Sequence, residues 1–490
     1  MERNERLLII PILILLSYFI FRLVDQFKML TYFPFDFTND WSSYIAQLHF
    51  LKVCGFHNLC PFWFNGFISF QLIPPAWFFF TLPYYYLFNN VLYATYFSLI
   101  TIFLIGFIAV FLSGKWFNFT KLQQILFFSL LFMNANVVGT YIRQGRITEL
   151  FGLTIFFIFA FFVLWYKDNT FDKKFLLVPF LLALIILSNI AVAILSLVLM
   201  FCLFLVSDFR QKVLVLFSIM AALLLSAFWW IPFIANFPIS LGAHLTNNFT
   251  SFLLSFSKSA VFINLGITLV SLFFMSLFFI CAKTKKFSRD FIFYTPMLIL
   301  ASLVLTRLVV FIPLLKTIYP DVYFSFFLFF GLILFFKSDL LQNNKKVLFL
   351  LIIASLGSVA VSHYHSPYFI EHTASQKEIL GILPEVDGKF IFLSLQNEKI
   401  YSKAFYSYAP IYYNLSTPAG WHASINYVLY QKINFLSKYF ENNQCKELKN
   451  SLYDLQVDQI ISIGAGCARL QNCGFEELKY NSEACLYGTN

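Results

Sequence analysis

Long apolar runs recur along this chain and constrain its fold more than any other feature of the sequence. A helix that crosses a membrane needs about 20 largely apolar residues. Hydrophobic residues make up 60% of the 490 positions and charged residues only 12%, a balance that the surface of a water-soluble domain does not carry. The sequence therefore predicts a polytopic membrane protein with about 11 transmembrane helices. The predicted spans are 7–24, 94–113, 122–139, 148–166, 175–189, 191–207, 212–232, 260–281, 291–309, 321–336 and 347–362.

The lysines and arginines between the apolar runs predict how the chain is oriented. Cytoplasmic loops carry an excess of Lys and Arg. With the N-terminus in the cytoplasm, the basic loops 114–121, 167–174, 208–212, 283–289 and 337–346 all fall on the cytoplasmic side. An odd number of spans then carries the C-terminal residues to the outside of the cell membrane. The formal net charge of +10 is scattered over these loops rather than gathered on one face, so no nucleic acid partner is expected.

The composition changes after the last apolar run, which predicts two domains. Residues 1–362 form the transmembrane domain, with a long first outer loop at 25–93, and residues 363–490 form an extracytoplasmic domain. In this second domain, KFIFLSLQ (389–396) and VDQIISIG (457–464) have the alternation of strands, whereas NYVLYQKINFLSKYF (426–440) has the spacing of an amphipathic helix. The predicted fold class is an all-α polytopic membrane domain followed by a small α/β extracytoplasmic domain.

The cysteines agree with this orientation. Six of the eight lie in segments predicted to be outside the cell, where disulfides persist. These disulfide candidates are Cys54 and Cys60 in the first outer loop and Cys445, Cys467, Cys473 and Cys485 in the C-terminal domain. The four cysteines of the C-terminal domain allow three pairings, and their spacing does not choose among them.

Several charged residues lie where a membrane protein rarely places them. The stretch FPFDFTNDW sets Asp36 and Asp40 among aromatic residues at the start of the first outer loop. The short loop GTYIRQGRITELFG (139–152) carries Arg143, Arg146 and Glu149 on the predicted outer side, against the positive-inside trend. Ionisable groups at membrane depth are costly, so each is a candidate functional residue.

Arg307 and Asp321 are further charged residues at predicted outer ends of spans. Arginine binds phosphate oxygens bidentately, so a group of arginines at this level suits a lipid-linked phosphate. A carboxylate opposite them can act as a general base or ligate a divalent metal such as Mg²⁺ or Mn²⁺.

Structural roles compete with these functional ones. Asp40 directly precedes the predicted helix 41–53, and aspartate is a preferred N-cap residue. That helix places Tyr44, Ile45, Leu48 and Leu51 at spacings of three and four, which predicts an amphipathic helix lying in the membrane interface. Arg146 and Glu149 are spaced to pair within one helical turn, and Arg307 could extend its side chain to the interface.

The chain resembles the GT-C superfamily of membrane glycosyltransferases. One inward-to-outward span, a long outer loop with an acid near its start, many further spans and an outer C-terminal domain are typical of that superfamily. More narrowly, residues 39–86, RQGRITELFGL (143–153) and TPAGWHASINYVLYQ (417–431) look like archaeal-type membrane proteins labelled "6-pyruvoyl-tetrahydropterin synthase related". The chain departs from such relatives at Tyr44, where a histidine is frequent, and at Val322, where an arginine is frequent.

The resemblance implies inverting sugar transfer, at the outer membrane face, from a polyprenyl-phosphate-linked donor to a glycan, lipid or protein acceptor. By position in the first loop, Asp40 would be the catalytic residue and Asp36 the second candidate. Arg143, Arg146 and Arg307 would bind the donor phosphate, with Glu149, Tyr44 and Asp321 in support. The alternatives are a transporter or flippase of a lipid-linked or polar solute, and a non-catalytic scaffold of the same fold.

Overall fold

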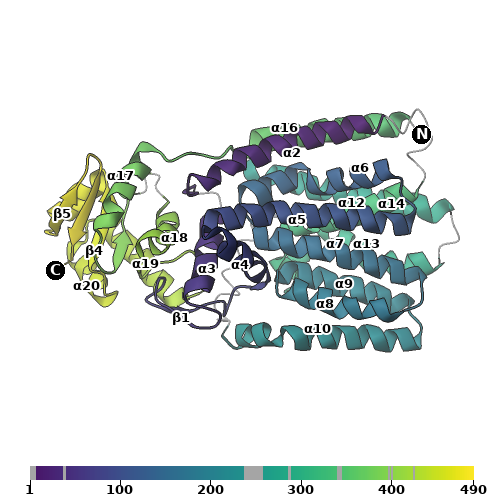
Figure 1. Cartoon of the computed structure of the whole chain (residues 1–490), viewed down its shortest axis with the longest axis horizontal. Coiled ribbons are helices and arrows are strands. Elements are labelled where there is room, and N and C mark those ends of the chain that lie inside the picture. Colours follow the sequence, from purple (N-terminus) through teal and green to yellow (C-terminus); the bar gives the residue numbers. More distant parts are fainter. Residues whose placement is uncertain are drawn as a thin grey trace.

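A helix bundle and a smaller C-terminal region make up the molecule, and they follow one another along its long axis (Figure 1). The computed structural model describes residues 7–36, 40–236, 258–284, 288–338, 345–395, 398, 401–422 and 425–489. The bundle helices run along the long axis, and the C-terminal region lies at the end of the bundle remote from residue 7 (Figure 1).

Each of the predicted apolar stretches contains a helix. The bundle helices are α2 (Ile9–Gln26), α5 (Val91–Ser113), α6 (Lys121–Phe132), α7 (Ile147–Asp168), α8 (Leu177–Ile186), α9 (Ile190–Val206), α10 (Phe209–Asn236), α12 (Lys258–Thr284), α13 (Ser288–Leu305), α14 (Pro320–Lys337) and α16 (Lys345–His365). Among the described residues, 7 helices are long and apolar enough to cross a membrane. The number is up to 8 if α6 and the π-helical turn η3 (Val137–Arg143), which meet at a bend of 64°, form one span. The predicted count of about 11 therefore matches the helices rather than the full-length spans, because α8, for example, has only 10 residues.

The centre of the bundle is formed by α7 and α14, which are buried along most of their length. Aromatic rings fill the space between them, as where the rings of Phe157 and Phe329 stack 5.2 Å apart. At the periphery, α16 lies beside α2 and exposes most of its apolar side chains (Figure 1). Such exposure is unfavourable in water and favourable in lipid, so it fits a membrane environment.

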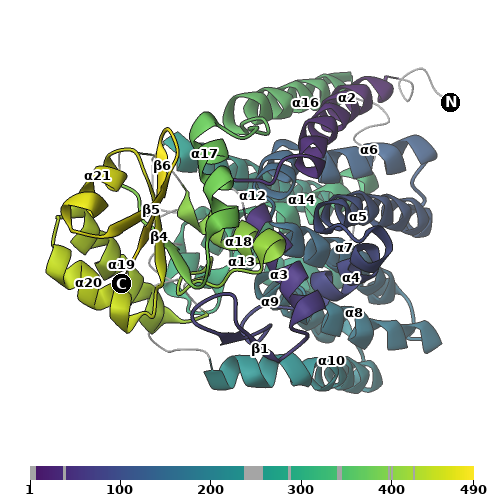
Figure 2. The ribbon, with the colours of Figure 1, turned by 60° about the vertical axis from the view of Figure 1, so that its left-hand side comes forward.

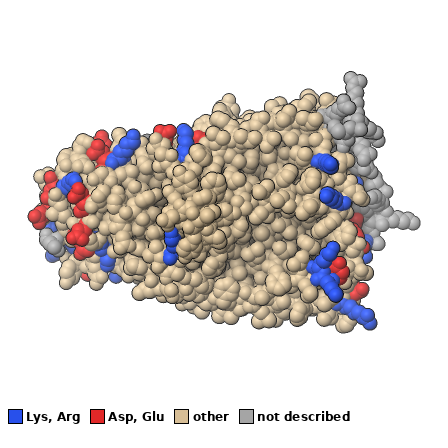
Figure 3. All heavy atoms as spheres, viewed as in Figure 1, with Lys and Arg blue, Asp and Glu red and all other residues tan. Residues whose placement is uncertain are grey.

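Most charged side chains on the face seen in Figure 3 lie toward the two ends of the molecule. On the face seen in Figure 3, Lys and Arg gather at the bundle end remote from the C-terminal region, while the C-terminal region carries both signs. Between these ends, a broad band is almost free of charged side chains (Figure 3). This band has the surface expected of a polytopic membrane domain.

The C-terminal region is built around a four-stranded mixed sheet. Its strands are β3 (Phe390–Phe392), β4 (Gln459–Ile463), β5 (Glu476–Tyr480) and β6 (Ala484–Gly488). The strand order is β3-β4-β6-β5, with β3 and β4 parallel and the other neighbours antiparallel. The region's helices are α17 (Ala374–Ile382), α18 (Ser402–Tyr413), α19 (Tyr427–Glu441), α20 (Cys445–Asp454) and α21 (Ala465–Asn472). Figure 2 shows α17 on one side of the sheet and α20 and α21 on the other.

The predicted strands, helix and bridged cysteines are confirmed. The predicted strands 389–396 and 457–464 contain β3 and β4, and the predicted helix 426–440 is α19. All six cysteines predicted to be bridged form disulfides, and the structure selects one pairing: Cys54 with Cys60, Cys445 with Cys473 and Cys467 with Cys485.

The first loop packs between the bundle and the C-terminal region. It contains α3 (Trp41–Val53), the short hairpin of β1 (Leu59–Cys60) and β2 (Phe67–Ile68), and α4 (Ala76–Phe88). The prediction that α3 is an amphipathic helix in the membrane interface is wrong, because residues on all its sides are buried, among them Trp41, Ser43 and Leu48. The helix contacts α4 and α5 of the membrane side and α18 of the C-terminal region, so both of its faces are covered.

Candidate active site

Asp40 and Arg146 are brought together by one backbone contact. The backbone N–H of Asp40 donates to the carbonyl of Gln144 over 2.5 Å, and the indole of Trp41 donates to the carbonyl of Ile142 over 2.9 Å. Gly145, which lies between Gln144 and Arg146 in the chain, has a φ of +82°. A side chain here would also be 2.5 Å from the Trp41 ring, so only glycine fits both the backbone and the space. The start of α3 is therefore held against the loop that carries Arg146.

Arg146 is the centre of a charged cluster at the end of the bundle. Its Nη1 lies 2.9 Å from Oδ2 of Asp321 and 3.8 Å from Oε1 of Glu149. The guanidinium carbon lies 3.6 Å from the centroid of the Tyr319 ring, which is a cation–π contact. Only 14% of the Arg146 side chain is exposed. Of the predicted supporting residues, Glu149 and Asp321 thus both face this arginine.

Hydroxyl groups hold the carboxylates of this cluster in place. Tyr141 donates to Oε1 of Glu149 over 3.0 Å, and Thr140 donates to Oδ1 of Asp321 over 3.2 Å. Thr148 donates to the hydroxyl of Tyr44 over 3.2 Å. Tyr44, the third predicted supporting residue, therefore lies at the edge of the cluster. Neighbours that fix the rotamers in this way keep a charged site preorganised.

Asp40 lies at the point where the bundle meets the C-terminal region. The side chain is half-buried and interacts electrostatically with Arg146 on the bundle side and with Lys403 of α18. It is also hydrogen-bonded to the side chain of Trp421. Burial raises the pKa of Asp40 above its ordinary value, and these three neighbours oppose that shift without cancelling it. A carboxylate with a raised pKa is a stronger base than an ordinary aspartate.

The proposed structural role of Asp40 as a helix cap is wrong. Asp40 occupies the N-cap position of α3, but its side chain makes no capping hydrogen bond. Its backbone has helical angles, with φ −93° and ψ −2°, instead of the extended angles of a capping residue.

The C-terminal region contributes residues that the sequence analysis did not place at this site. Trp421 is buried, the ring of Tyr401 meets it edge-on at 5.2 Å, and Nε2 of His422 lies 2.9 Å from the hydroxyl of Ser43. The residues just before Trp421 are bonded to the first loop, because the N–H of Thr417 donates to the carbonyl of Phe62 over 2.9 Å. The motif TPAGWH contains Trp421 and His422, but the sequence gives no signal that the motif meets Asp40, about 380 residues earlier.

Asp36, the second predicted catalytic residue, pairs with Arg143, one of the predicted phosphate-binding arginines. Nη2 of Arg143 lies 2.5 Å from Oδ2 of Asp36, and the two side chains are 2% and 8% exposed. Nε of Arg143 also donates to the carbonyl of Pro367, in the segment that follows α16, over 2.8 Å. Arg143 therefore connects the first loop to the segment that follows α16.

Arg307 is directed toward a neighbouring helix. It follows α13 with a left-handed φ of 63°, and its guanidinium donates to the Thr268 hydroxyl over 3.1 Å and to the Asn264 carbonyl over 3.3 Å, both on α12. Of the three arginines predicted to bind phosphate, the interactions described here place only Arg146 beside Asp40.

The acids around Arg146 are paired with that arginine. Within the described ranges, no three His, Cys, Asp or Glu side chains meet as ligands for a metal ion. Asp321 and Glu149 face the guanidinium of Arg146, which supplies the positive charge between them. The predicted Mg²⁺ or Mn²⁺ stays a prediction, since one or two carboxylates together with a substrate phosphate can hold such an ion.

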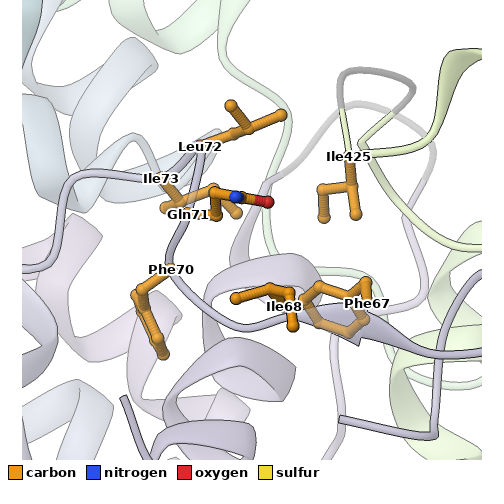
Figure 4. A pocket seen from close by; sticks show the side chains of 7 residues that line it. All are labelled: Phe67, Ile68, Phe70, Gln71, Leu72, Ile73 and Ile425. Carbon is orange, nitrogen blue, oxygen red and sulfur yellow. The ribbon is translucent and has the colours of Figure 1, made fainter. Parts of the chain in front are cut away.

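A small groove lies apart from the charged cluster. It is lined by Phe67, Ile68, Phe70, Gln71, Leu72, Ile73 and Ile425 (Figure 4). Gln71 is the one polar side chain among these lining residues, so the groove offers no charge to a phosphate or a sugar hydroxyl.

The fold is similar to that of membrane glycosyltransferases of the GT-C class. The archaeal oligosaccharyltransferase AglB from Archaeoglobus fulgidus, in complex with an inhibitory peptide and a dolichol-phosphate, matches 92% of this chain and 69% of its own, with 11% identity and a TM-score of 0.57. The same enzyme tethered to an acceptor peptide containing the NVT sequon matches 97% of this chain and 74% of its own, with 12% identity and a TM-score of 0.56.

A second GT-C enzyme has the same fold. The arabinofuranosyltransferase AftD from Mycobacteria matches 97% of this chain but only 41% of its own, with 13% identity and a TM-score of 0.54. At such identities the likeness shows the fold alone. No protein-family model and no curated protein matches the chain, so the label "6-pyruvoyl-tetrahydropterin synthase related" has no support.

Proposed function

We propose that this protein is a membrane glycosyltransferase that moves a sugar, with inversion, from a polyprenyl-phosphate-linked donor to an acceptor at the outer membrane face. The observation that carries the proposal is the meeting of Asp40 and Arg146 at the end of a GT-C-like bundle. A base and a fixed cation at one site are what displacement of a lipid phosphate requires. AglB, which has a similar fold, binds dolichol-phosphate, and this supports a lipid phosphate as the leaving group.

In this mechanism Asp40 acts as the general base. Its carboxylate takes the proton of an acceptor hydroxyl, and the acceptor oxygen attacks the anomeric carbon of the donor sugar. The bond between that carbon and the phosphate oxygen breaks, and the lipid phosphate leaves with the electron pair. Because attack and departure occur on opposite faces of the carbon, the anomeric configuration inverts. Asp40 then releases the proton to water.

Arg146 stabilises the leaving phosphate. A guanidinium has five N–H donors, and the contacts of Arg146 with Asp321 and Glu149 both involve Nη1. The remaining donors can reach phosphate oxygens, and stacking on Tyr319 fixes their direction. Asp321 and Glu149 hold the arginine in this orientation.

The test is transfer from a radiolabelled polyprenyl-phosphate sugar by the purified protein, with wild type compared to Asp40→Asn. Loss of a general base lowers kcat by about 10²–10⁴-fold, and we expect a loss in this range. Asp454→Asn, an exposed carboxylate of α20, is the matched control and should transfer normally. Undiminished transfer by a folded Asp40→Asn protein would remove Asp40 from the mechanism. Donor binding without turnover by wild type would instead favour the non-catalytic scaffold, and solute flux in proteoliposomes the transporter.

A further inference from the structure

Asp40 interacts with side chains from two parts of the molecule: the bundle, to which its backbone N–H is bonded, and the C-terminal region, whose helix α18 packs on α3. On the bundle side, Arg146 interacts electrostatically with Glu149, Asp321 and Asp40. On the other side, Lys403 interacts with His422 and with Asp40. The two cations that act on Asp40 therefore come from different parts of the molecule, one from the membrane domain and one from the C-terminal region.

The C-terminal side of Asp40 is a face formed by Tyr401, Lys403, Trp421 and His422, which we call the acceptor face. Trp421 hydrogen-bonds to Asp40, and Tyr401 packs edge-on against Trp421. Burial and the charge of Lys403 lower the pKa of His422 to about 4, so its imidazole is neutral at pH 7. Lys403 is thus the charged group of an otherwise aromatic and neutral face.

The ammonium of Lys403 is not committed to an ion pair with any described residue. Lys403 is half-buried in the first turn of α18, and its Nζ lies 5.5 Å from the centroid of the Tyr430 ring. Asp40 acts on Lys403 only from beyond salt-bridge distance, and a partly buried cation with no carboxylate in direct contact is costly unless an anion accompanies it. Arg146, by contrast, already has Asp321 and Glu149 beside it.

The two sides of Asp40 suit the two substrates, given the proposed function on which this inference rests. The donor's phosphate is attached to a membrane lipid, so it reaches the bundle side, where Arg146 lies. A base that deprotonates the acceptor must touch the acceptor, which leaves the opposite side of Asp40 for that substrate. We propose that Lys403 determines acceptor specificity by binding an anionic group, a carboxylate or a phosphate, close to the hydroxyl that receives the sugar.

The experiment measures equilibrium binding of matched glycosides to the purified full chain by saturation-transfer NMR titration. Methyl glucuronide and methyl glucoside share a ring and differ in one carboxylate, and methyl glucoside 6-phosphate tests phosphate in its place. We expect wild type to bind an anionic probe about tenfold more tightly than the neutral one, since a charge-assisted hydrogen bond has about that effect. The anionic probe that binds more tightly distinguishes a carboxylate-bearing from a phosphate-bearing acceptor.

Variants at position 403 then assign the preference to this lysine. We expect Lys403→Gln to lose the preference for the anionic probes while its affinity for the neutral probe is unchanged. Lys403→Arg should keep the preference. The control is Lys438→Gln at an exposed lysine of α19, which should bind all probes as wild type does. Equal affinity of wild type for all three probes, or an equal loss of both classes in Lys403→Gln, would overturn the proposal. The binding titration is independent of the transfer assay described above. A charge preference in the titration with no sugar transfer in the assay would refute only the glycosyltransferase. Sugar transfer with no charge preference would refute only the role of Lys403.

Discussion

At the residue scale, the protonation of Asp40 is set by opposing influences. Burial favours the neutral acid, whereas Arg146, Trp421 and Lys403 favour the carboxylate, and the net result is a raised pKa. A general base must be ionised to act, so activity falls as the pH drops through the pKa of that base. An aspartate with a raised pKa loses its charge at a higher pH than an ordinary aspartate does.

This predicts the acid side of the pH–rate profile. We expect kcat/KM to decline about tenfold per pH unit below an apparent pKa that lies above 3.8, the ordinary value for aspartate. In Arg146→Gln the remaining activity should decline from a still higher pH, because a cation that lowers the pKa of Asp40 is gone. Measurement of kcat/KM from pH 4 to 8 in both proteins checks the prediction, and an unshifted limb in the variant would contradict it.

Single residues could be selected from the sequence when their charge conflicted with their position. Arg146, Glu149 and Asp321 were found because ionisable groups at membrane depth are rare, and the structure brings all three together. The same argument also selected Asp36 and Arg143, which pair with each other across 107 positions. A charge in an unusual place has a partner or a function, and sequence alone does not distinguish these outcomes when the partner is distant.

At the element scale, the segment that follows α16 is held at several points. Arg22 of α2 donates to the carbonyls of Ser366 and Pro367 over 2.9 Å each, and the carboxylate of Asp25 accepts from the N–H of Phe369 over 2.9 Å. Arg143 adds its bond to Pro367. These contacts fix where the chain enters the C-terminal region.

The pair of Asp36 and Arg143 should therefore matter for stability. Removing one partner of a buried ion pair leaves an uncompensated charge, which costs about 3–5 kcal/mol. We expect Arg143→Gln to lower the free energy of unfolding by about this amount, and the double variant Asp36→Asn with Arg143→Gln to cost less than the sum of the single variants. Denaturant unfolding in detergent measures the cycle. Additive effects would show that the two side chains do not depend on each other.

The incorrect prediction for α3 shows what a helical pattern does not report. Apolar residues at spacings of three and four indicate that one face of a helix is buried, but not whether the other face meets solvent. The other face of α3 carries Ser42, Ser43 and Gln47, all buried, and α18 packs against this helix. That contact depends on how the C-terminal region docks, which no local periodicity encodes.

Disulfides stabilise the C-terminal region, which has only a small sheet for a core. The bridges Cys445–Cys473 and Cys467–Cys485 close loops of 28 and 18 residues. Each loop of this size contributes about 3 kcal/mol by restricting the unfolded chain. We expect dithiothreitol to make this region susceptible to limited proteolysis while the bundle stays intact. A Cys202→Ser, Cys281→Ser variant, which lacks both free cysteines, should respond as wild type does, whereas unchanged resistance under reduction would contradict a stabilising role.

At the scale of the whole molecule, the helices could be predicted because membrane burial demands long apolar stretches, a property of local sequence. The fold class could be predicted for the same reason. The site could be predicted only in part, since it forms where the first loop, the loop before α7 and the segment 417–422 meet. Docking of the C-terminal region creates that meeting, and Lys403 and Tyr401 became candidates only through it.

The proposed function depends on one property of the whole molecule, its orientation in the membrane. Lys and Arg gather at the bundle end remote from the C-terminal region (Figure 3), which by the positive-inside rule should be cytoplasmic. The disulfides of the C-terminal region also need an oxidising compartment.

Single cysteines introduced for labelling test this orientation. In a background without the two free cysteines, we expect Lys438→Cys to react in intact cells with a membrane-impermeant maleimide and Lys115→Cys to react only after lysis. Lys438 lies on α19 of the C-terminal region, and Lys115 lies beyond α5 in a basic loop. The reverse pattern would place Asp40 and Arg146 at the cytoplasmic face. There the donor would have to present its sugar to the cytoplasm, and the outer-face reaction proposed above would be wrong, even though the arrangement of the site would be unchanged.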